Sequence, residues 1–150
     1  MATRVLRRWH GMLGLPQQSP LSWYQDRLQE ELHEQQTATT SWQRISETSN
    51  ILFSISRANF NGFPICRLPS ITGPLHVLVY AYMLVKYTSC WTFYRVATML
   101  CHAPQYNLVQ EVVNPTRDHK LNEVASHHQI DQEQFKRVSC QLHQLWPLFL

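Results

Sequence analysis

The 150-residue sequence predicts an all-α fold, a compact helical bundle of about five to six helices with a C-terminal helix-turn-helix-like pair. With 44% hydrophobic residues, the chain can bury a continuous core. It has only 4 glycines and no regular series of short alternating segments, which disfavours a β-sandwich or a barrel. Apolar residues instead recur at three- and four-residue steps, the spacing of amphipathic helices.

We expect a basic N-terminal arm and linker over residues 1–19 and a single helical domain over residues 20–150. The arm contains arginines and no acidic residue, as mitochondrial presequences do, so targeting by residues 1–16 stays an alternative to a cytoplasmic location. Serine is absent from that stretch, which weakens the targeting interpretation. The longest apolar run, residues 75–85, is shorter than the roughly 20 residues of a membrane-spanning helix, so we expect no membrane association.

Individual helices follow from periodicity and breakers. Apolar residues spaced along residues 20–36 predict a first helix, and Ser41 is the expected N-cap of a second helix over residues 42–59. Two helices joined by so short a loop are expected to pack antiparallel. Glycine and proline residues make residues 61–73 an irregular connection.

The second half of the chain is less regular. Pro74 begins an apolar segment that reaches about residue 102, either as one long helix or as a kinked pair. Pro104 is able to start a further short helix, and residues 118–145 divide near Gln129 into the helix-turn-helix-like pair. That pair offers little base-reading chemistry, so we do not expect sequence-specific DNA binding. The four scattered cysteines indicate neither a zinc ribbon nor a disulfide framework.

The most informative chemical feature is a set of carboxylates on the first two predicted helices. Glu34 follows Glu31 by three residues and Glu30 by four, so all three can lie on one helix face. On the second helix Glu47 and Asn50 are again three residues apart. Like charges at this spacing cost a few tenths of a kcal/mol, which a bound cation offsets. The sequence therefore predicts a pocket for a hard cation such as Mg²⁺ or for a guanidinium group.

A simpler interpretation is a solvated helix face on which Arg27 and Arg44 balance the glutamates. Basic residues elsewhere in the chain stand among aromatic residues, a mixture that suits phosphates and stacked bases. The candidate phosphate-binding residues are Arg95, Arg117 and Lys120, the last two in a proline-led loop that is equally consistent with ordinary helix capping.

Residues 31–34 (ELHE) and 47–50 (ETSN), followed by Ile51, resemble the ExxE, spacer, ExxD pattern of the MazG-like all-α nucleoside triphosphate pyrophosphohydrolases. The resemblance covers about a quarter of the chain. It implies that Glu31, Glu34 and Glu47 are magnesium ligands and that a water molecule attacks a phosphoanhydride. The departure from the pattern is Asn50, which stands where the family has aspartate.

Four longer blocks give a second resemblance, beginning with SWYQDRLQEELHE and ISETSNILFSISRANFNGFP and continuing with YAYMLVKYTSCWTFYRVA and EVVNPTRDHKLNEVASHHQID. Together they resemble a family of small filamentous-fungal proteins that is similar to the arginine-containing cyclodipeptide synthases of secondary-metabolite biosynthesis. This resemblance implies a transferase that joins aminoacyl groups from transfer RNA, arginyl-tRNA among them, into a cyclic dipeptide without a cofactor.

Under either resemblance the protein is expected to be an enzyme, with the cyclodipeptide synthase preferred and the pyrophosphohydrolase as the alternative. A non-catalytic helical adaptor is the third alternative. The sequence does not indicate an oligomeric state. The expected catalytic residues are Glu31, Glu34 and Glu47, and the expected substrate-binding residues are Asn50, Arg95, Arg117 and Lys120.

Overall fold

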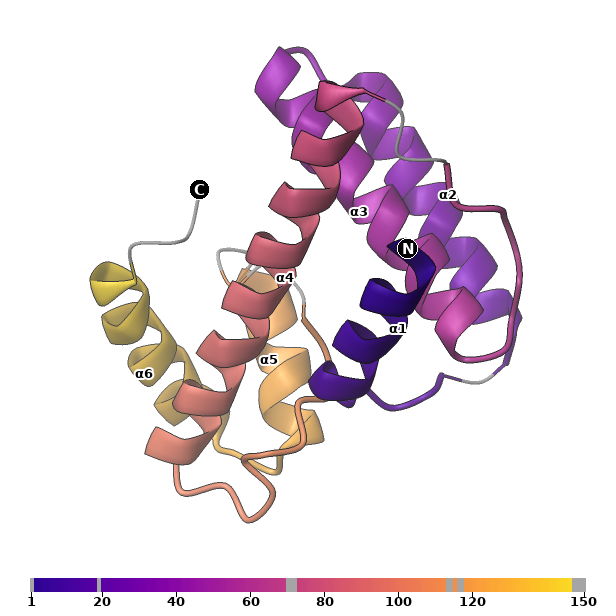
Figure 1. Ribbon diagram of the computed structural model, residues 1–150. Coiled ribbons are helices and arrows are strands. Elements are labelled where there is room, and N and C mark those ends of the chain that lie inside the picture. Colours follow the sequence, from indigo (N-terminus) through magenta and orange to yellow (C-terminus); the bar gives the residue numbers. More distant parts are fainter. Residues whose placement is uncertain (1, 19, 70–72, 113–114, 116–117, 147–150) are drawn as a thin grey trace. The chain divides into compact units, whose positions relative to one another are not determined.

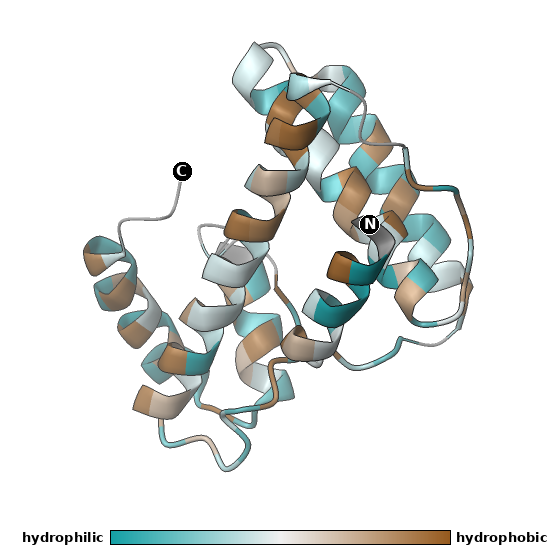
Figure 2. Cartoon of the chain, viewed as in Figure 1, coloured by the Kyte–Doolittle hydropathy of each residue, from teal (hydrophilic) through white to brown (hydrophobic). Residues whose placement is uncertain are grey.

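The computed structural model describes residues 2–18, 20–69, 73–112, 115 and 118–146. Within these residues the chain forms six α-helices and no β-strand (Figure 1), so the all-α prediction is confirmed. The helices are α1 (Ala2–Leu13), α2 (Ser22–Thr37), α3 (Ser41–Phe60), α4 (Pro74–Leu100), α5 (Asp118–His127) and α6 (Gln132–Leu145). Figure 2 shows hydrophilic and apolar residues mixed along the helices.

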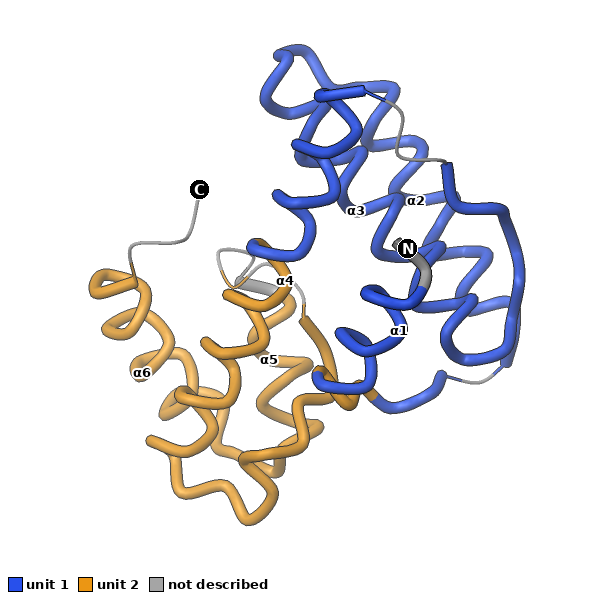
Figure 3. Tube along the Cα trace, in the orientation of Figure 1, with its two compact units in different colours: residues 1–12, 16–85 blue, residues 13–15, 86–150 orange. Residues whose placement is uncertain are grey.

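The chain divides into two compact units (Figure 3). Unit 1 consists of residues 1–12 and 16–85, and unit 2 consists of residues 13–15 and 86–150. Helix α4 contributes to both units.

Helices α2 and α3 pack against each other in unit 1, close to the predicted ranges. Near their connection Gln35 Nε2 donates a hydrogen bond to Thr48 Oγ1 at 2.8 Å. At the other end of the pair Asn61 Nδ2 donates to the Tyr24 hydroxyl at 2.7 Å. Residues early in α2 thus meet residues beyond the end of α3, and the two helices are antiparallel.

The start of α3 is held by Thr40, and the prediction of Ser41 as N-cap is wrong. Thr40 Oγ1 accepts a hydrogen bond from the Gln43 N–H at 3.1 Å, while Gln43 Oε1 accepts from the Thr40 N–H at 3.2 Å. This reciprocal capping box requires a glutamine or glutamate three residues after the cap, and only Thr40 satisfies that spacing here.

Helix α1 covers most of the segment that we expected to be an arm. Leu6 and Trp9 are buried, and the Trp9 and Phe53 rings meet edge to face at a centroid distance of 6.0 Å. His10 Nε2 lies 2.8 Å from Ser56 Oγ, also in the interior. One side of α1 is therefore part of the core of unit 1, against α3.

The apolar segment that starts at Pro74 is one continuous helix, α4. The hydroxyls of Thr92 and Thr98 donate to the carbonyls four residues earlier, at 2.8 and 2.7 Å, so these threonines are accommodated within the helix. The helix ends at Leu100, followed by His102 with a φ of 56°, and the Ala103 N–H donates to the Thr98 carbonyl at 3.0 Å. This is the Schellman pattern of a helix C-terminus.

No helix begins at Pro104 within the described residues 104–112, so the short helix predicted there is wrong. The segment makes turns and then runs without helical hydrogen bonds, while Val109 and Val112 are buried. Proline permits a helix start, but this segment lacks the repeated apolar face that would stabilise a helix.

Helices α5 and α6 pack against each other in unit 2, and the predicted C-terminal pair is confirmed. The chain reverses at Gln129, whose φ is 56°, and the Ile130 N–H donates to the Ala125 carbonyl at 2.9 Å. Asp131 then caps α6 by accepting from the Gln134 N–H at 2.9 Å. Both helix ends are satisfied within a very short connection.

Two further observations concern apolar helix segments and the cysteines. Among the helices that the described residues form, none carries an apolar stretch sufficient to cross a membrane. The four cysteines are all free, with Cys90 and Cys101 buried.

A candidate cation site between α2 and α3

The antiparallel pairing of α2 and α3 brings three of the predicted glutamates together. Glu31, Glu34 and Glu47 each present a carboxylate oxygen, and these three oxygens lie within 4.8 Å of one another. We call them the glutamate trio. Glu31 and Glu34 come from α2 and Glu47 from α3, so the cluster exists only because the two helices pack in this register.

Glu31 is the buried member of the trio, with 1% of its surface exposed. Its Oε1 receives an ion pair from Arg27 Nη2 at 2.5 Å, one helical turn earlier. Its Oε2 is buried and has no hydrogen-bond partner among the described residues. An unsatisfied carboxylate oxygen in a protein interior is costly, which is a physical indication that this atom binds something.

The electrostatics of Glu31 agree with this indication. Burial raises the pKa of the Glu31 carboxyl above its ordinary value, although Arg27 opposes the rise. The Glu34 and Glu47 carboxylates raise this pKa further, while the Asn50 amide lowers it. A cation placed among the three carboxylates would favour their ionised forms and reverse this shift.

Asn50 acts on Glu47. Asn50 Nδ2 donates a hydrogen bond to Glu47 Oε2 at 2.8 Å, and the Asn50 side chain is mostly buried. An asparagine adds no charge to the cluster, but its amide fixes the orientation of the Glu47 carboxylate. The second predicted helix thus contributes one charged group and one neutral group that holds it.

Glu30 lies outside the trio. Its Oε2 accepts from Arg27 Nη1 at 2.7 Å, and half of its side chain is exposed. Arg44, the other arginine expected to balance the glutamates, is exposed and forms no ion pair with any residue in the described parts of the chain. The solvated-face interpretation thus describes Glu30, whereas Glu31 is buried.

The predicted phosphate-binding residues belong to unit 2 or lie outside the described residues. The Arg95 guanidinium stacks on the Trp91 ring at 4.7 Å from its centroid. Lys120 Nζ pairs with Glu123 Oε2 at 3.2 Å. Arg117 lies outside the described residues, so the proposed anion-binding loop has no structural account.

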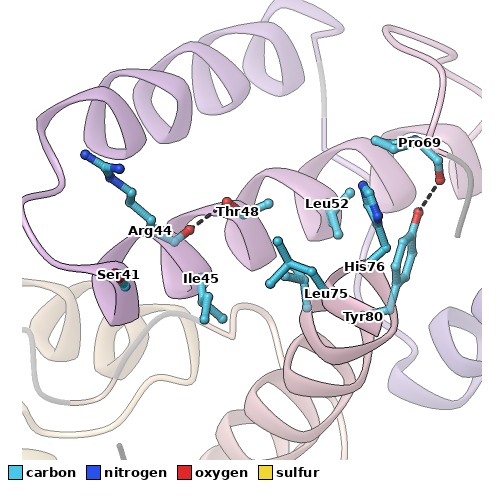
Figure 4. A pocket seen from close by; sticks show the side chains of 10 residues that line it. Ser41, Arg44, Ile45, Thr48, Leu52, Pro69, Leu75, His76 and Tyr80 are labelled. Atoms are coloured by element: carbon cyan, nitrogen blue, oxygen red, sulfur yellow. Dashed lines mark hydrogen bonds between the residues drawn. The ribbon is translucent and has the colours of Figure 1, made fainter. Parts of the chain in front are cut away.

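Sequence reasoning gave no indication of a pocket of about 340 Å³ between α3 and the start of α4 (Figure 4). Its walls are mainly apolar, and the Arg44 guanidinium points away from Leu52 and Leu75 in Figure 4. The Tyr80 hydroxyl donates to the Pro69 carbonyl at 2.9 Å. Glu47 lies about 140° around α3 from Leu52, so the pocket and the glutamate trio occupy different sides of the helix.

A test of fit for a metal ion uses the spacing of the oxygens. Mg²⁺ binds oxygen at about 2.1 Å, so two opposite ligands stand about 4.2 Å apart, and opposite ligands of Ca²⁺ about 5 Å apart. The oxygens of the trio lie within 4.8 Å of one another. Three carboxylates with that spacing, one of them with an unsatisfied buried oxygen, fit a hard divalent cation after small side-chain movements.

Comparison with known proteins adds no name to this geometry. No protein-family model, no curated protein and no solved structure matches the chain.

Proposed function

We propose that the α2–α3 pair forms a divalent-cation site and that the protein is a Mg²⁺-dependent hydrolase of phosphoanhydrides, such as those of nucleoside triphosphates. The observation that supports this proposal most is the buried Oε2 of Glu31, which has no hydrogen-bond partner in the described parts of the chain and lies beside two further carboxylates. Folding alone gains nothing from placing three carboxylates within 4.8 Å of one another. A cation offsets that cost.

Each residue has a separate role in the proposal. Glu31, Glu34 and Glu47 hold the cation, and Arg27 keeps Glu31 oriented through its other oxygen. When bound, Mg²⁺ would offset negative charge on the phosphoanhydride oxygens and lower the pKa of a neighbouring water. Asn50 positions Glu47 and contributes no charge, so we expect weaker cation binding than a site with four carboxylates would have.

Cation binding is tested on the full chain by calorimetry and by thermal unfolding with Mg²⁺, Mn²⁺ and Ca²⁺. We expect a saturable rise in melting temperature that Glu34→Gln abolishes. Glu30→Gln is the matched control, because it removes one charge from the same helix outside the trio. Equal responses in the two variants would show that the cations screen surface charge and occupy no site.

Asn50→Asp is a gain-of-function test. It adds a fourth carboxylate next to Glu47, so we expect roughly tenfold tighter cation binding, the effect of about 1.4 kcal/mol. If Asn50→Asp left the cation affinity unchanged while Glu34→Gln abolished cation binding, residue 50 would lie outside the coordination shell.

The chemical step is tested by incubating purified protein with nucleoside triphosphates and Mg²⁺. We expect release of pyrophosphate that is lost in Glu34→Gln and retained in Glu30→Gln. If the protein bound cations but hydrolysed no phosphoanhydride, the proposed cation site would stand and the proposed reaction would be wrong.

The arginine-containing cyclodipeptide synthase is the second candidate. The observation in its favour is that Glu31 already binds a guanidinium group, that of Arg27, at 2.5 Å. In this proposal the remaining carboxylates receive the side chain of an arginyl group delivered by transfer RNA. Expression in a heterologous host and mass spectrometry for arginine-containing cyclic dipeptides tests it, and negative results in both assays favour the adaptor.

A further inference from the structure

Helix α1 has two opposite sides with different chemistry. Leu6, Trp9 and His10 are buried in unit 1, as described above. Arg4, Arg7 and Arg8 are exposed. At about 100° per residue, the three arginines span one side of the helix, opposite the buried side. Gly11 points to the same side of the helix as these arginines. We call Arg4, Arg7, Arg8 and Gly11 the arginine face.

The arginines of this face have no partner among the residues that the structure describes. Arg4, Arg7 and Arg8 form no ion pair, hydrogen bond or ring contact with any residue in the described part of the chain. Among residues 4–13 of α1, the other exposed residues are the apolar Val5 and Met12 and the glycine. Three positive charges within about one turn of helix therefore face outward without a counter-charge from the described residues.

Gly11 has no structural explanation. A Cβ atom added there would meet nothing within 4 Å, so alanine fits without strain. The glycine that ends the helix is Gly14, whose φ of 58° lies in the left-handed region that favours glycine. Glycine is the least favourable residue in a helix after proline, so Gly11 weakens α1 without a gain in packing. What it does provide is open backbone in the middle of the arginine face.

We propose that the arginine face binds the phosphodiester backbone of a nucleic acid. Guanidinium groups bind phosphate oxygens in bidentate fashion. The bare helix at Gly11 lets the strand approach closely enough for all three arginines to reach it. This inference is independent of the glutamate trio, which lies on the α2–α3 pair.

A nucleic acid fits this face better than an anionic membrane. The apolar side of α1 is buried in the protein and cannot enter a bilayer. Binding to acidic lipids by charge alone uses clusters of about four to eight basic residues. The open space at Gly11 also gives a continuous backbone room to approach, which separate, mobile lipid headgroups do not need.

The size of the effect follows from counterion release. Each phosphate contact with a single strand contributes about 0.7 to the slope of log K against log salt, so three contacts contribute about 2. At 0.1 M salt that corresponds to about a 100-fold increase in affinity. The face therefore strengthens the binding of a nucleic acid and does not select its sequence.

The test measures fluorescence anisotropy of labelled RNA and DNA oligonucleotides, single-stranded and duplex, with the full chain between about 20 and 200 mM salt. We expect Arg4→Gln/Arg7→Gln/Arg8→Gln to lower the slope by about 2 and the affinity at 0.1 M salt by about 100-fold. The matched control neutralises three exposed basic residues elsewhere, Arg67, Lys136 and Arg137, and removes the same net charge. Equal losses in the two triple variants would overturn the proposal.

Gly11→Leu separates binding from folding. Leucine points into open space and favours the helix, so we expect a melting temperature raised by about 2 °C or more. With all charges retained, we expect weaker nucleic-acid binding because the side chain covers the approach. Unchanged affinity in this variant, or binding of phosphatidylserine vesicles with no binding of either nucleic acid, would also overturn the proposal. Comparing RNA with DNA shows which backbone is preferred.

Discussion

The two helix pairs, α2–α3 in unit 1 and α5–α6 in unit 2, are alike in construction and differ in what they bury. Each is joined by a short connection, and each second helix has a side-chain N-cap. The α5–α6 pair buries mainly apolar groups, among them Leu121, Val124 and Phe135, together with the small, uncharged side chain of Ser139. The α2–α3 pair buries Glu31 and Asn50 as well. An apolar seam is enough to join two helices, so the buried carboxylate requires an explanation beyond folding.

The largest expected effect tests the apolar pair. Phe135 is fully buried, and Phe135→Ala should destabilise the protein by about 3–5 kcal/mol, from lost burial and the cavity left behind. Urea unfolding measures this loss, with Lys136→Ala on the exposed side of α6 as control. A loss below about 1 kcal/mol would mean that apolar packing does not hold α5 and α6 together.

Acid should lower the free energy of unfolding through His10, which packs against α3 in unit 1. Burial, assisted by Arg57, lowers the pKa of His10 to about 4. The imidazole of His10 therefore binds a proton more tightly in the unfolded chain than in the folded protein. The stability that neutral His10 provides above pH 6.5 is lost as the pH falls towards 4. The loss should be about 3 kcal/mol at pH 4. Urea unfolding across this pH range should show it in the natural protein and not in His10→Gln.

Glu31→Gln tests the buried charge of the α2–α3 pair, and we expect it to raise stability where Phe135→Ala lowers it. Because the pKa of Glu31 is raised on folding, its contribution to stability is present at low pH and lost as the pH rises through the folded pKa. Glutamine resembles the protonated form, so at pH 7 without metal the variant should be about 1 kcal/mol more stable. The same variant should lose the stabilisation by cations. Destabilisation without metal would identify Glu31 as a structural ion-pair partner of Arg27.

The smallest effect concerns the connection of α5 and α6. Gln129 has a φ of 56°, a backbone conformation in which glycine is favoured. Gln129→Gly should stabilise the protein by about 0.5–1 kcal/mol in thermal unfolding. His102→Gly, at the equivalent position after α4, should do the same, whereas Ser126→Gly within α5 should destabilise.

The helices that were predictable from the sequence are those whose signals are local. Leu28 and its apolar neighbours mark α2, and the reversal at Gln129 follows from the change of apolar phase between α5 and α6. Pro104 was misleading because a favourable first residue does not make a helix without a face to bury. The continuity of α4 also needed the structure, since a run such as Thr88 to Cys90 has weak helix propensity and is helical here because it packs in the interior.

For the candidate site, sequence spacing indicated which glutamates share a face but not their depth. Glu30 and Glu31 are adjacent, yet one is half exposed and the other is buried, because the packing of α3 covers only one of them. The burial of His10 against Ser56 joins residues 46 positions apart, which no local pattern indicates. Such pairings depend on how the helices pack, which periodicity does not encode.

The capping box at Thr40 also limits how this hairpin can vary. Gln43 Oε1 accepts from the N–H and hydroxyl of Thr39 and from the N–H of Thr40, so the corner between the two helices is clamped at one residue. Inserting one residue after Gln43 and before Glu47 would rotate Glu47 by about 100° around the helix axis, away from Glu31 and Glu34. The capping box at Thr40 would stay intact. Lengthening the chain on this side of the clamp should therefore disable the site, and lengthening the exposed connection after Phe60 should be tolerated.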